Sequence, residues 1–327
     1  MVLTSLLFVL NITIGSSSLS FNHVLDSLFN PSEVKKGVRF IVNEVRLPRA
    51  LTALISGAAL AIAGLFMQTI FRNPLAGPFI LGINSGASLG VAILIMGSSA
   101  FGLTVSGSVS VTTGAFLGAI GVFSIVLLAA TKIKNSISLL LIGMMLAAFS
   151  SAIVNMLQYF SSAQELEQFV IWGMGSFGSV TLRQIPFYAS ILIASITASI
   201  LILKPLNALL LGENNASISG VKVKQTRIFT IIITCLLAGI VTAYCGPISF
   251  IGLAIPNITR YLFKTSNHFI LFPAVIFMGS SVALLCSIIA QLPGDNAVLP
   301  INIVTSFIGA PIVIWIILKN RKMQLSL

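Results

Sequence analysis

Long apolar runs separated by short polar stretches make up most of the chain. A helix that crosses a hydrocarbon core of about 30 Å needs roughly 20 apolar residues. On that measure the sequence predicts ten membrane-spanning helices, at approximately 2–18, 50–70, 79–98, 104–130, 137–159, 185–203, 228–245, 250–263, 269–290 and 300–318. We therefore expect an all-α integral membrane protein in which residues 1–327 form a single transmembrane domain.

Composition supports the membrane interpretation. The chain is 57% hydrophobic and 8% charged, whereas about 25% of the residues of a typical soluble domain are charged. The first residues could form a signal peptide, but they carry no Lys or Arg and no clear cleavage site. We interpret them as the first membrane helix.

Charge bias fixes the expected orientation. The net charge of +11 could suggest nucleic acid, but no nucleic-acid-binding pattern is present. Lys and Arg accumulate in cytoplasmic loops of membrane proteins. With both termini inside, the predicted inner loops are strongly basic and contain one acidic residue, Glu213, while basic and acidic residues balance in the outer loops. The longest inner connection, about 204–227, is too polar after Leu211 to span and predicts short surface helices.

No constellation of catalytic or metal-binding residues is evident. Phosphate-loop spacing is absent, the cysteines Cys235, Cys245 and Cys286 lie in or beside apolar runs, and His23 and His268 stand apart from other ligands. We therefore expect buried packing cysteines, no metal, no cofactor and no enzyme activity in this chain. An ion-coupled carrier usually keeps an ionisable residue at mid-membrane, and its absence predicts that energy comes from a partner.

Two further patterns leave alternatives open. The predicted outer segment VKKGVRFIVNEVRLPRA is rich in basic residues, and either a solvated loop or a docking surface for an acidic partner explains it. Small residues recur in SGAALAIAG (56–64) and NSGASLG (84–90). Such spacing favours close helix packing, with Asn84, Ser85 and Ser88 as candidates for a pathway lining.

Several blocks together resemble one known family. RLPRALTALISGAALAIAGLFMQTIFRNPLAGPFILGINSGASLG (46–90) resembles the signature of the FecCD permeases, and four later blocks follow in the family's order: WGMGSFGSVTLRQ (172–184), LLGENNASISGV (210–221), GPISFIGLAIPNITR (246–260) and VLPINIVTSFIGAPIVIWIILK (298–319). FecCD proteins are the membrane subunits of ABC importers for iron-siderophores, haem and vitamin B12.

The resemblance implies an architecture and a set of partners. It implies a type II ABC importer permease with ten membrane helices in the bacterial cytoplasmic membrane. A second permease subunit would complete a central pathway, two ATPase subunits would bind inside, and a substrate-binding protein would dock outside. Arg46 and Arg49, the arginines of the R-L-P-R block, would then contact the binding protein.

Roles at the cytoplasmic face also follow from the resemblance. It places the loop around Gly212, Glu213, Ser217 and Gly220 against the ATPase. It also assigns gating at the inner mouth to the N-P-L turn and to the loop before the fifth helix: Asn73, Leu75, Asn135 and Ser136.

Two positions depart from the family pattern. Asn257 stands where the family usually has His, with Arg260 retained, and Gln291 replaces a basic residue that some members carry before the last helix.

A ferric siderophore is the expected cargo because a bare metal ion would require carboxylate, His or Cys ligands in the spans. Haem or vitamin B12 remains an alternative, as does a stand-alone secondary carrier.

Overall fold

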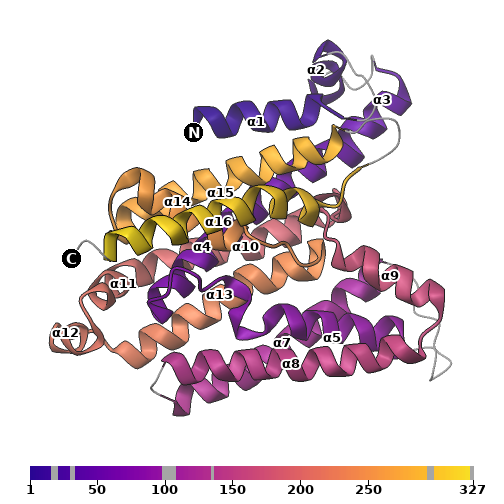
Figure 1. The fold of residues 1–327 in the computed structure, drawn as a ribbon. Helices are drawn as coiled ribbons and strands as arrows, with labels where there is room; N and C mark the ends of the chain where they lie inside the picture. Colours follow the sequence, from indigo (N-terminus) through magenta and orange to yellow (C-terminus); the bar gives the residue numbers. More distant parts are fainter. Residues whose placement is uncertain (16–20, 30–33, 98–107, 134–135, 293–297, 325–327) are drawn as a thin grey trace.

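The computed structural model describes residues 1–15, 21–29, 34–97, 108–133, 136–292 and 298–324, and every regular element in those ranges is helical (Figure 1). The α-helices are α1 (Val2–Thr13), α2 (Phe21–Phe29), α3 (Lys36–Phe40), α4 (Leu47–Phe71), α5 (Ile83–Ile95), α7 (Ser108–Lys132), α8 (Ser136–Phe160), α9 (Ala163–Gly173), α10 (Ile185–Ser199), α11 (Leu203–Leu210), α12 (Glu213–Ile218), α13 (Val223–Cys245), α14 (Ile251–Phe263), α15 (His268–Gln291) and α16 (Ile301–Gln324). A π-helical stretch, η1 (Ile41–Arg46), and three 3-10 turns, η2 (Pro78–Leu81), η3 (Phe177–Ser179) and η4 (Ile200–Ile202), lie between them.

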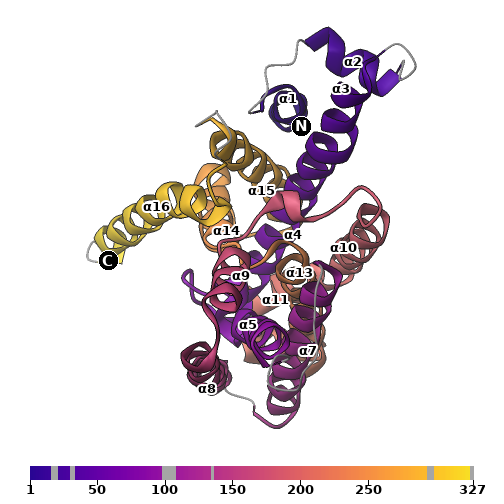
Figure 2. The ribbon, with the colours of Figure 1, turned by 90° about the vertical axis from the view of Figure 1, so that its right-hand side faces the viewer.

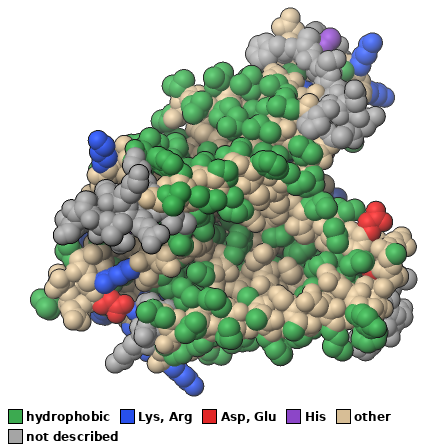
Figure 3. Space-filling view, viewed as in Figure 1, with side chains coloured by type: hydrophobic (Ala, Val, Ile, Leu, Met, Phe, Trp, Pro, Cys, Tyr) green, Lys and Arg blue, Asp and Glu red, His purple; other side chains and the backbone are tan. Residues whose placement is uncertain are grey.

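A helix occupies each of the ten apolar segments. Within the described residues, six helices are long and apolar enough to cross a membrane, and α1, α5 and the first part of α16 are shorter apolar helices. The all-helical fold is therefore confirmed, whereas the number of crossings stays a prediction. Hydrophobic side chains cover the flanks of the long helices, and charged side chains gather toward their ends (Figure 3).

Two stretches are more helical than the sequence pattern indicated. The predicted outer loop before Leu47 is helical from Lys36, because α3, η1 and α4 run on as one helix to Phe71. The helix α9 was not predicted. Its start is a capping box, in which the Ser162 hydroxyl accepts the Glu165 N–H at 3.4 Å and the Glu165 carboxylate accepts the Ser162 N–H at 2.9 Å.

The core has two parts, and α13 contributes to both. One buried apolar cluster surrounds α4 and includes α1, α10, α11, α14 and α15, while the second lies between α5, α7 and α8. The helix α13 contributes Ile233 and Leu237 to the first cluster and Ile231 and Cys235 to the second. It therefore connects the two packed units.

Close helix crossings occur where the sequence places glycines. A Cβ added at Gly64 of α4 would overlap the carbonyl oxygen of Gly252 in α14, and one at Gly57 would overlap that of Gly279 in α15. The predicted role of the small residues of SGAALAIAG in helix packing is therefore confirmed.

Loops and short helices gather at the two ends of the bundle. At one end, on the left in Figure 1, lie α11 and α12, and at the other lie α2, α3 and α9. We call the α11–α12 end the basic end. Lysines and arginines of its loops and helix ends gather there: Arg72, Lys132, Lys204, Lys222, Lys224 and Lys264.

Candidate functional site

An ion pair fastens α12 to the start of α13 at the basic end. Arg227 Nη2 donates to Glu213 Oε1 at 2.5 Å. The arginine side chain is 7% exposed and that of the glutamate 46%, so the pair has one buried and one accessible partner. Gly212, just before α12, has a φ of 111°, a conformation that only glycine adopts without strain. The ion pair therefore ties α12 to a residue near the start of a long helix.

A groove opens beside this ion pair. It encloses about 840 Å³ between the end of α7, the helix α12 and the first turn of α13. Glu213, Ser217 and Gly220, three of the four residues predicted to face an ATPase, line it together. Lys132, Lys222 and Lys224 also line it, so the groove offers cationic and hydrogen-bonding groups to an approaching surface.

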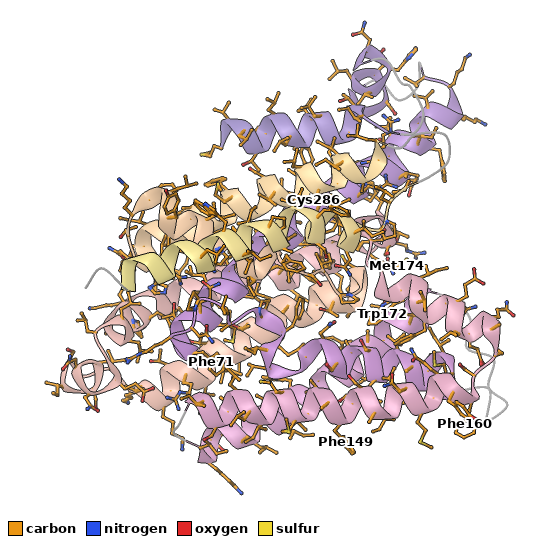
Figure 4. The ribbon with its side chains drawn as sticks, viewed as in Figure 1. Phe71, Phe149, Phe160, Trp172, Met174 and Cys286 are labelled. Atoms are coloured by element: carbon orange, nitrogen blue, oxygen red, sulfur yellow. The ribbon has the colours of Figure 1, made fainter. Side chains whose placement is uncertain are left out.

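The N-P-L turn follows α4 at the same end. Arg72 ends α4 in the left-handed conformation, with a φ of 46°, and its Nη2 donates to the carbonyl of Leu209 in α11 at 3.1 Å. The side-chain oxygen of Asn73 accepts the N–H of Leu75 at 2.9 Å. Leu75 itself is 41% exposed. The turn is thus a hydrogen-bonded unit with one exposed leucine. Figure 4 labels Phe71, the last residue of α4 before the turn.

Asn257 of α14 holds the turn from the other side. Its Nδ2 donates to the carbonyl of Pro74 at 2.8 Å and to that of Leu253 at 2.8 Å. The side chain is 8% exposed. An amide has two N–H donors, and here both are used. This departure from the family pattern therefore has a structural role.

A second link between α4 and α14 lies one turn away. Gln68 Nε2 donates to the Leu253 carbonyl at 3.1 Å, and the Arg260 guanidinium donates to the side-chain oxygen of Gln68. Because Asn257 and Gln68 both donate to the Leu253 carbonyl, α4, the turn and α14 form one network. We call Gln68, Asn73, Asn257 and Arg260 the turn network.

His268, the first residue of α15, joins two other helices at the basic end. It is fully buried, and both its backbone N–H and its Nδ1 lie within 2.8 Å of the side-chain oxygen of Asn207 in α11. The Asn207 amide nitrogen donates to Asn267 at 2.8 Å. This fixes the Asn207 oxygen toward His268, so Nδ1 carries the proton. The His268 Nε2 lies 2.9 Å from the hydroxyl of Thr69 in α4, and α4, α11 and α15 are thereby joined.

Sequence reasoning missed much of this arrangement. His268 was left without a role because no ligand neighbours it in the sequence, and Gln68 and Asn207 were not singled out. Gln68 carried one usable signal, because a polar side chain within a long apolar helix normally has a buried partner. The remaining gate candidates are less informative, since Asn135 lies outside the described residues and Ser136 is placed only as the first residue of α8.

The two predicted docking arginines lie at the opposite end of α4. Arg46 is 3% exposed, and its Nη1 donates to the carbonyls of Ile12 and Thr13, at 3.1 and 2.6 Å, where α1 ends. Arg49 is half-buried and approaches Gly178 in η3. The exposed cations nearby lie on and beside α3: Lys35, Lys36 and Arg39.

Gln291 and the three cysteines are buried in the interior. Gln291 is 4% exposed, and its amide nitrogen donates to the Ser287 carbonyl at 2.9 Å. Cys235, Cys245 and Cys286 are all buried and unbridged, as their apolar surroundings predicted; Figure 4 labels Cys286 in α15. In the part of the chain that the structure describes, no three His, Cys, Asp or Glu side chains are grouped as metal ligands.

Most of the chain is similar to known permeases. Residues 3–319 match the FecCD transport family. The haemin transport system permease HmuU of Yersinia pestis is 34% identical over 95% of this chain and 91% of its own length. The vitamin B12 import permease BtuC of Klebsiella pneumoniae subsp. pneumoniae is 38% identical over 88% and 84%.

Solved structures give the same result. A metal-chelate type ABC transporter in an inward-facing conformation superposes with a TM-score of 0.82, at 33% identity over 97% of both chains. PsaBC from Streptococcus pneumoniae, at 15% identity and a TM-score of 0.55, shares the fold alone. The chain therefore belongs to the FecCD transport family.

Proposed function

We propose that this chain is the membrane-spanning permease of an ABC importer that carries an iron chelate, a ferric siderophore, into the cytoplasm. The match to the FecCD transport family over residues 3–319 carries this proposal. The chemistry of the described interior supports a chelate over a bare ion, because a bare ion would need a group of oxygen, nitrogen or sulfur ligands in the spans.

The proposed assembly contains four further subunits: two ATPase subunits, a second permease and an extracytoplasmic binding protein. The exposed apolar surface of α8 supports the second permease. Met145, Phe149, Met156 and Phe160 are all exposed there, and Figure 4 labels Phe149 and Phe160 along this helix. A contiguous apolar surface of this kind packs against another subunit or lipid.

The ATPase is proposed to bind at the basic end, which we place in the cytoplasm. The positive charge of this end supports that orientation and puts both termini inside. The groove lined by Glu213, Ser217 and Gly220 would receive the ATPase surface. The Glu213–Arg227 ion pair would then pass the movement of α12 to α13, the helix shared by the two packed units.

The gate is proposed to move as a unit with α4 and α14. Asn73 closes the turn internally, Asn257 ties the turn to α14 through the Pro74 carbonyl, and Gln68 ties α4 to α14 through the Leu253 carbonyl. Bending the turn alone would break the hydrogen bond from Asn257 to Pro74, which contributes about 1 kcal/mol. Tilting of α4 and α14 together preserves this bond and the Gln68 link, and it carries Leu75 across the inner mouth.

Docking of the binding protein is proposed at the opposite end. Its surface would include Arg49 and the exposed cations Lys36 and Arg39, which can attract an acidic partner. Arg46 would take part only after its side chain leaves the α1 carbonyls. The double variant Arg46→Glu with Arg49→Glu should weaken docking, most strongly at low salt. If the double variant and the wild type had equal affinity for the binding protein at all salt concentrations, docking at this surface would be contradicted.

The decisive experiment is uptake into vesicles that contain the purified permease with its ATPase and binding protein. We expect ATP-dependent uptake of a ferric siderophore. The relatives named for haemin and vitamin B12 make these two the competing cargoes, and ATP-dependent uptake of either one instead would replace the siderophore. Uptake driven by an ion gradient with this chain alone would favour a secondary carrier and contradict the ABC assignment.

A further inference from the structure

A narrow crevice opens between α7 and α13, away from the basic end and its groove. It encloses about 250 Å³. Its residues come from the middle of α7, from α13 and from the start of α5: Ile83, Phe116, Ala119, Ile120, Phe123, Ser124, Cys235, Leu236 and Gly239. No Lys, Arg, Asp or Glu lines it, so an ionic or strongly polar ligand finds no partner there.

The crevice has a closed floor and an open rim. Ile83 and Ala119 on the floor are 1% and 4% exposed, whereas Ile120 and Leu236 on the rim are 40% and 39% exposed. The one hydroxyl, that of Ser124, already donates to the Ile120 carbonyl at 2.8 Å. The walls are therefore apolar and their polar groups are satisfied.

The space exists because the facing residues are small. A Cβ added at Gly239 would meet only Ile83, at 3.8 Å, which is ordinary van der Waals contact. By contrast, glycines at the other crossings described above are in direct contact with a neighbouring backbone. At Gly239 the missing side chain leaves a recess, with room on the order of eight groups of the size of a water molecule, about 30 Å³ each.

In a bilayer, the surface around the rim would face hydrocarbon. The helix α7 is exposed at Leu117, Ile125 and Leu128 as well as Ile120, and both α7 and α13 are long and apolar enough to span a membrane. Figure 2 shows α7 and α10 on the same side of the molecule, with α13 nearer its middle. A recess left empty beside this medium would forfeit dispersion contacts along its walls.

We propose that the crevice binds the methyl-terminated end of one acyl chain of a membrane lipid. The middle of a hydrocarbon core about 30 Å thick is about 15 Å from either headgroup layer. Only the far end of an acyl chain reaches that depth from the lipid side. This proposal does not depend on the cargo or on the ATPase. It implies that a lipid tail fills part of the space between α7 and α13.

Photo-crosslinking tests the proposal in vesicles that contain the full chain. The probe is a phosphatidylcholine with a diazirine near the methyl end of one chain, and adducts are mapped by peptide mass spectrometry. We expect adducts concentrated on crevice residues of α7 and α13 such as Ile120, Phe123 and Leu236, above those on exposed Leu117 and Leu128. The same lipid with its diazirine beside the glycerol backbone should not label these residues.

Filling the recess provides the matched variant. Gly239→Leu should lower crevice labelling roughly tenfold, because its side chain takes the place of about two buried methylene groups of the lipid. Ala119→Leu fills the recess from the opposite wall and should give the same loss of labelling. It replaces Gly239→Leu as the test if that variant fails to fold. Gly121→Leu is the control, since a Cβ at Gly121 meets no atom within 4 Å, and it should leave crevice labelling unchanged.

Two results would overturn the proposal. Labelling of the crevice no stronger than that of exposed Leu117 and Leu128, and unaffected by Gly239→Leu, would mean ordinary contact with the surrounding bilayer. Cross-links from crevice residues to a second copy of the chain would identify a protein interface instead.

Discussion

Asn257 Nδ2 lies 2.8 Å from the carbonyl oxygen of Pro74, so a side chain of α14 holds a turn 183 residues earlier in the sequence. The same amide donates to Leu253 within its own helix. The stiffness of the N-P-L turn therefore has two sources. Proline restricts the backbone locally, and a distant helix fixes the position of the turn in the bundle.

Removing this contact should uncouple the turn from α14. We expect Asn257→Ala to reduce ATP-driven uptake several-fold and to lower the free energy of unfolding by about 1–2 kcal/mol, because two hydrogen bonds are lost. Asn257→His places the usual family residue there and retains a donor, so it should restore most uptake. Vesicle uptake and thermal unfolding measure the two effects. Full uptake by Asn257→Ala would contradict the proposed movement of turn and helices together.

The ion pair between α12 and α13 should matter more for coupling than for folding. Glu213→Ala leaves Arg227 without this carboxylate, at a cost of about 1 kcal/mol because the glutamate is accessible to water. We expect a larger effect on the ratio of cargo transported to ATP hydrolysed. Ile218→Ala, at an exposed position of α12 that does not line the groove, is the control. A normal transport ratio in Glu213→Ala would argue against transmission through this pair.

The buried histidine should be a structural junction. His268→Leu keeps an apolar side chain in place but removes the side-chain hydrogen bonds to Asn207 and Thr69. Each such bond contributes about 1 kcal/mol, so a fall in thermal stability is expected. His268→Gln can keep one of the two contacts, so its thermal stability should lie between those of the wild type and His268→Leu. Wild-type stability in His268→Leu would show that the contacts with α11 and α4 contribute little.

Arg46 should stabilise the first helix. Arg46→Leu removes the donors to the Ile12 and Thr13 carbonyls, so faster amide hydrogen exchange is expected throughout α1. Arg39→Leu, on exposed α3, should leave exchange in α1 unchanged. Exchange in α1 that is the same in both variants would indicate that Arg46 is not what holds this helix.

The tight crossing of α4 and α14 should tolerate no side chain. Gly64→Ala would force its Cβ into the Gly252 carbonyl, and we expect a loss of about 3 kcal/mol or more, since a backbone contact cannot rotate away as a side chain can. Gly121→Ala, at an open position of α7, should be neutral or slightly stabilising. Thermal unfolding in detergent compares the two, and equal stability would contradict the crossing.

Particular residues show how far the sequence could be interpreted. The Gly-Pro segments 77–83 and 246–255 look alike in the sequence, and each leads into a helix of 13 residues, α5 and α14. Their contact was not predictable, because it joins residues far apart: a Cβ at Gly252 would meet the ring of Pro78. Likewise, Ser162 and Glu165 are a readable helix start, whereas nothing near His268 in the sequence indicates Asn207 or Thr69.

The sequence by itself determined the all-helical membrane fold, the positions of the apolar helices and the family. These properties depend on local periodicity, on the length of apolar runs and on ordered motifs, all of which lie within short stretches of chain. Only the tertiary structure decided that Asn257 holds the Pro74 carbonyl, that Arg46 faces α1, and that a recess opens at Gly239. Each of these depends on which helices lie side by side, and that follows from the packing of the whole chain.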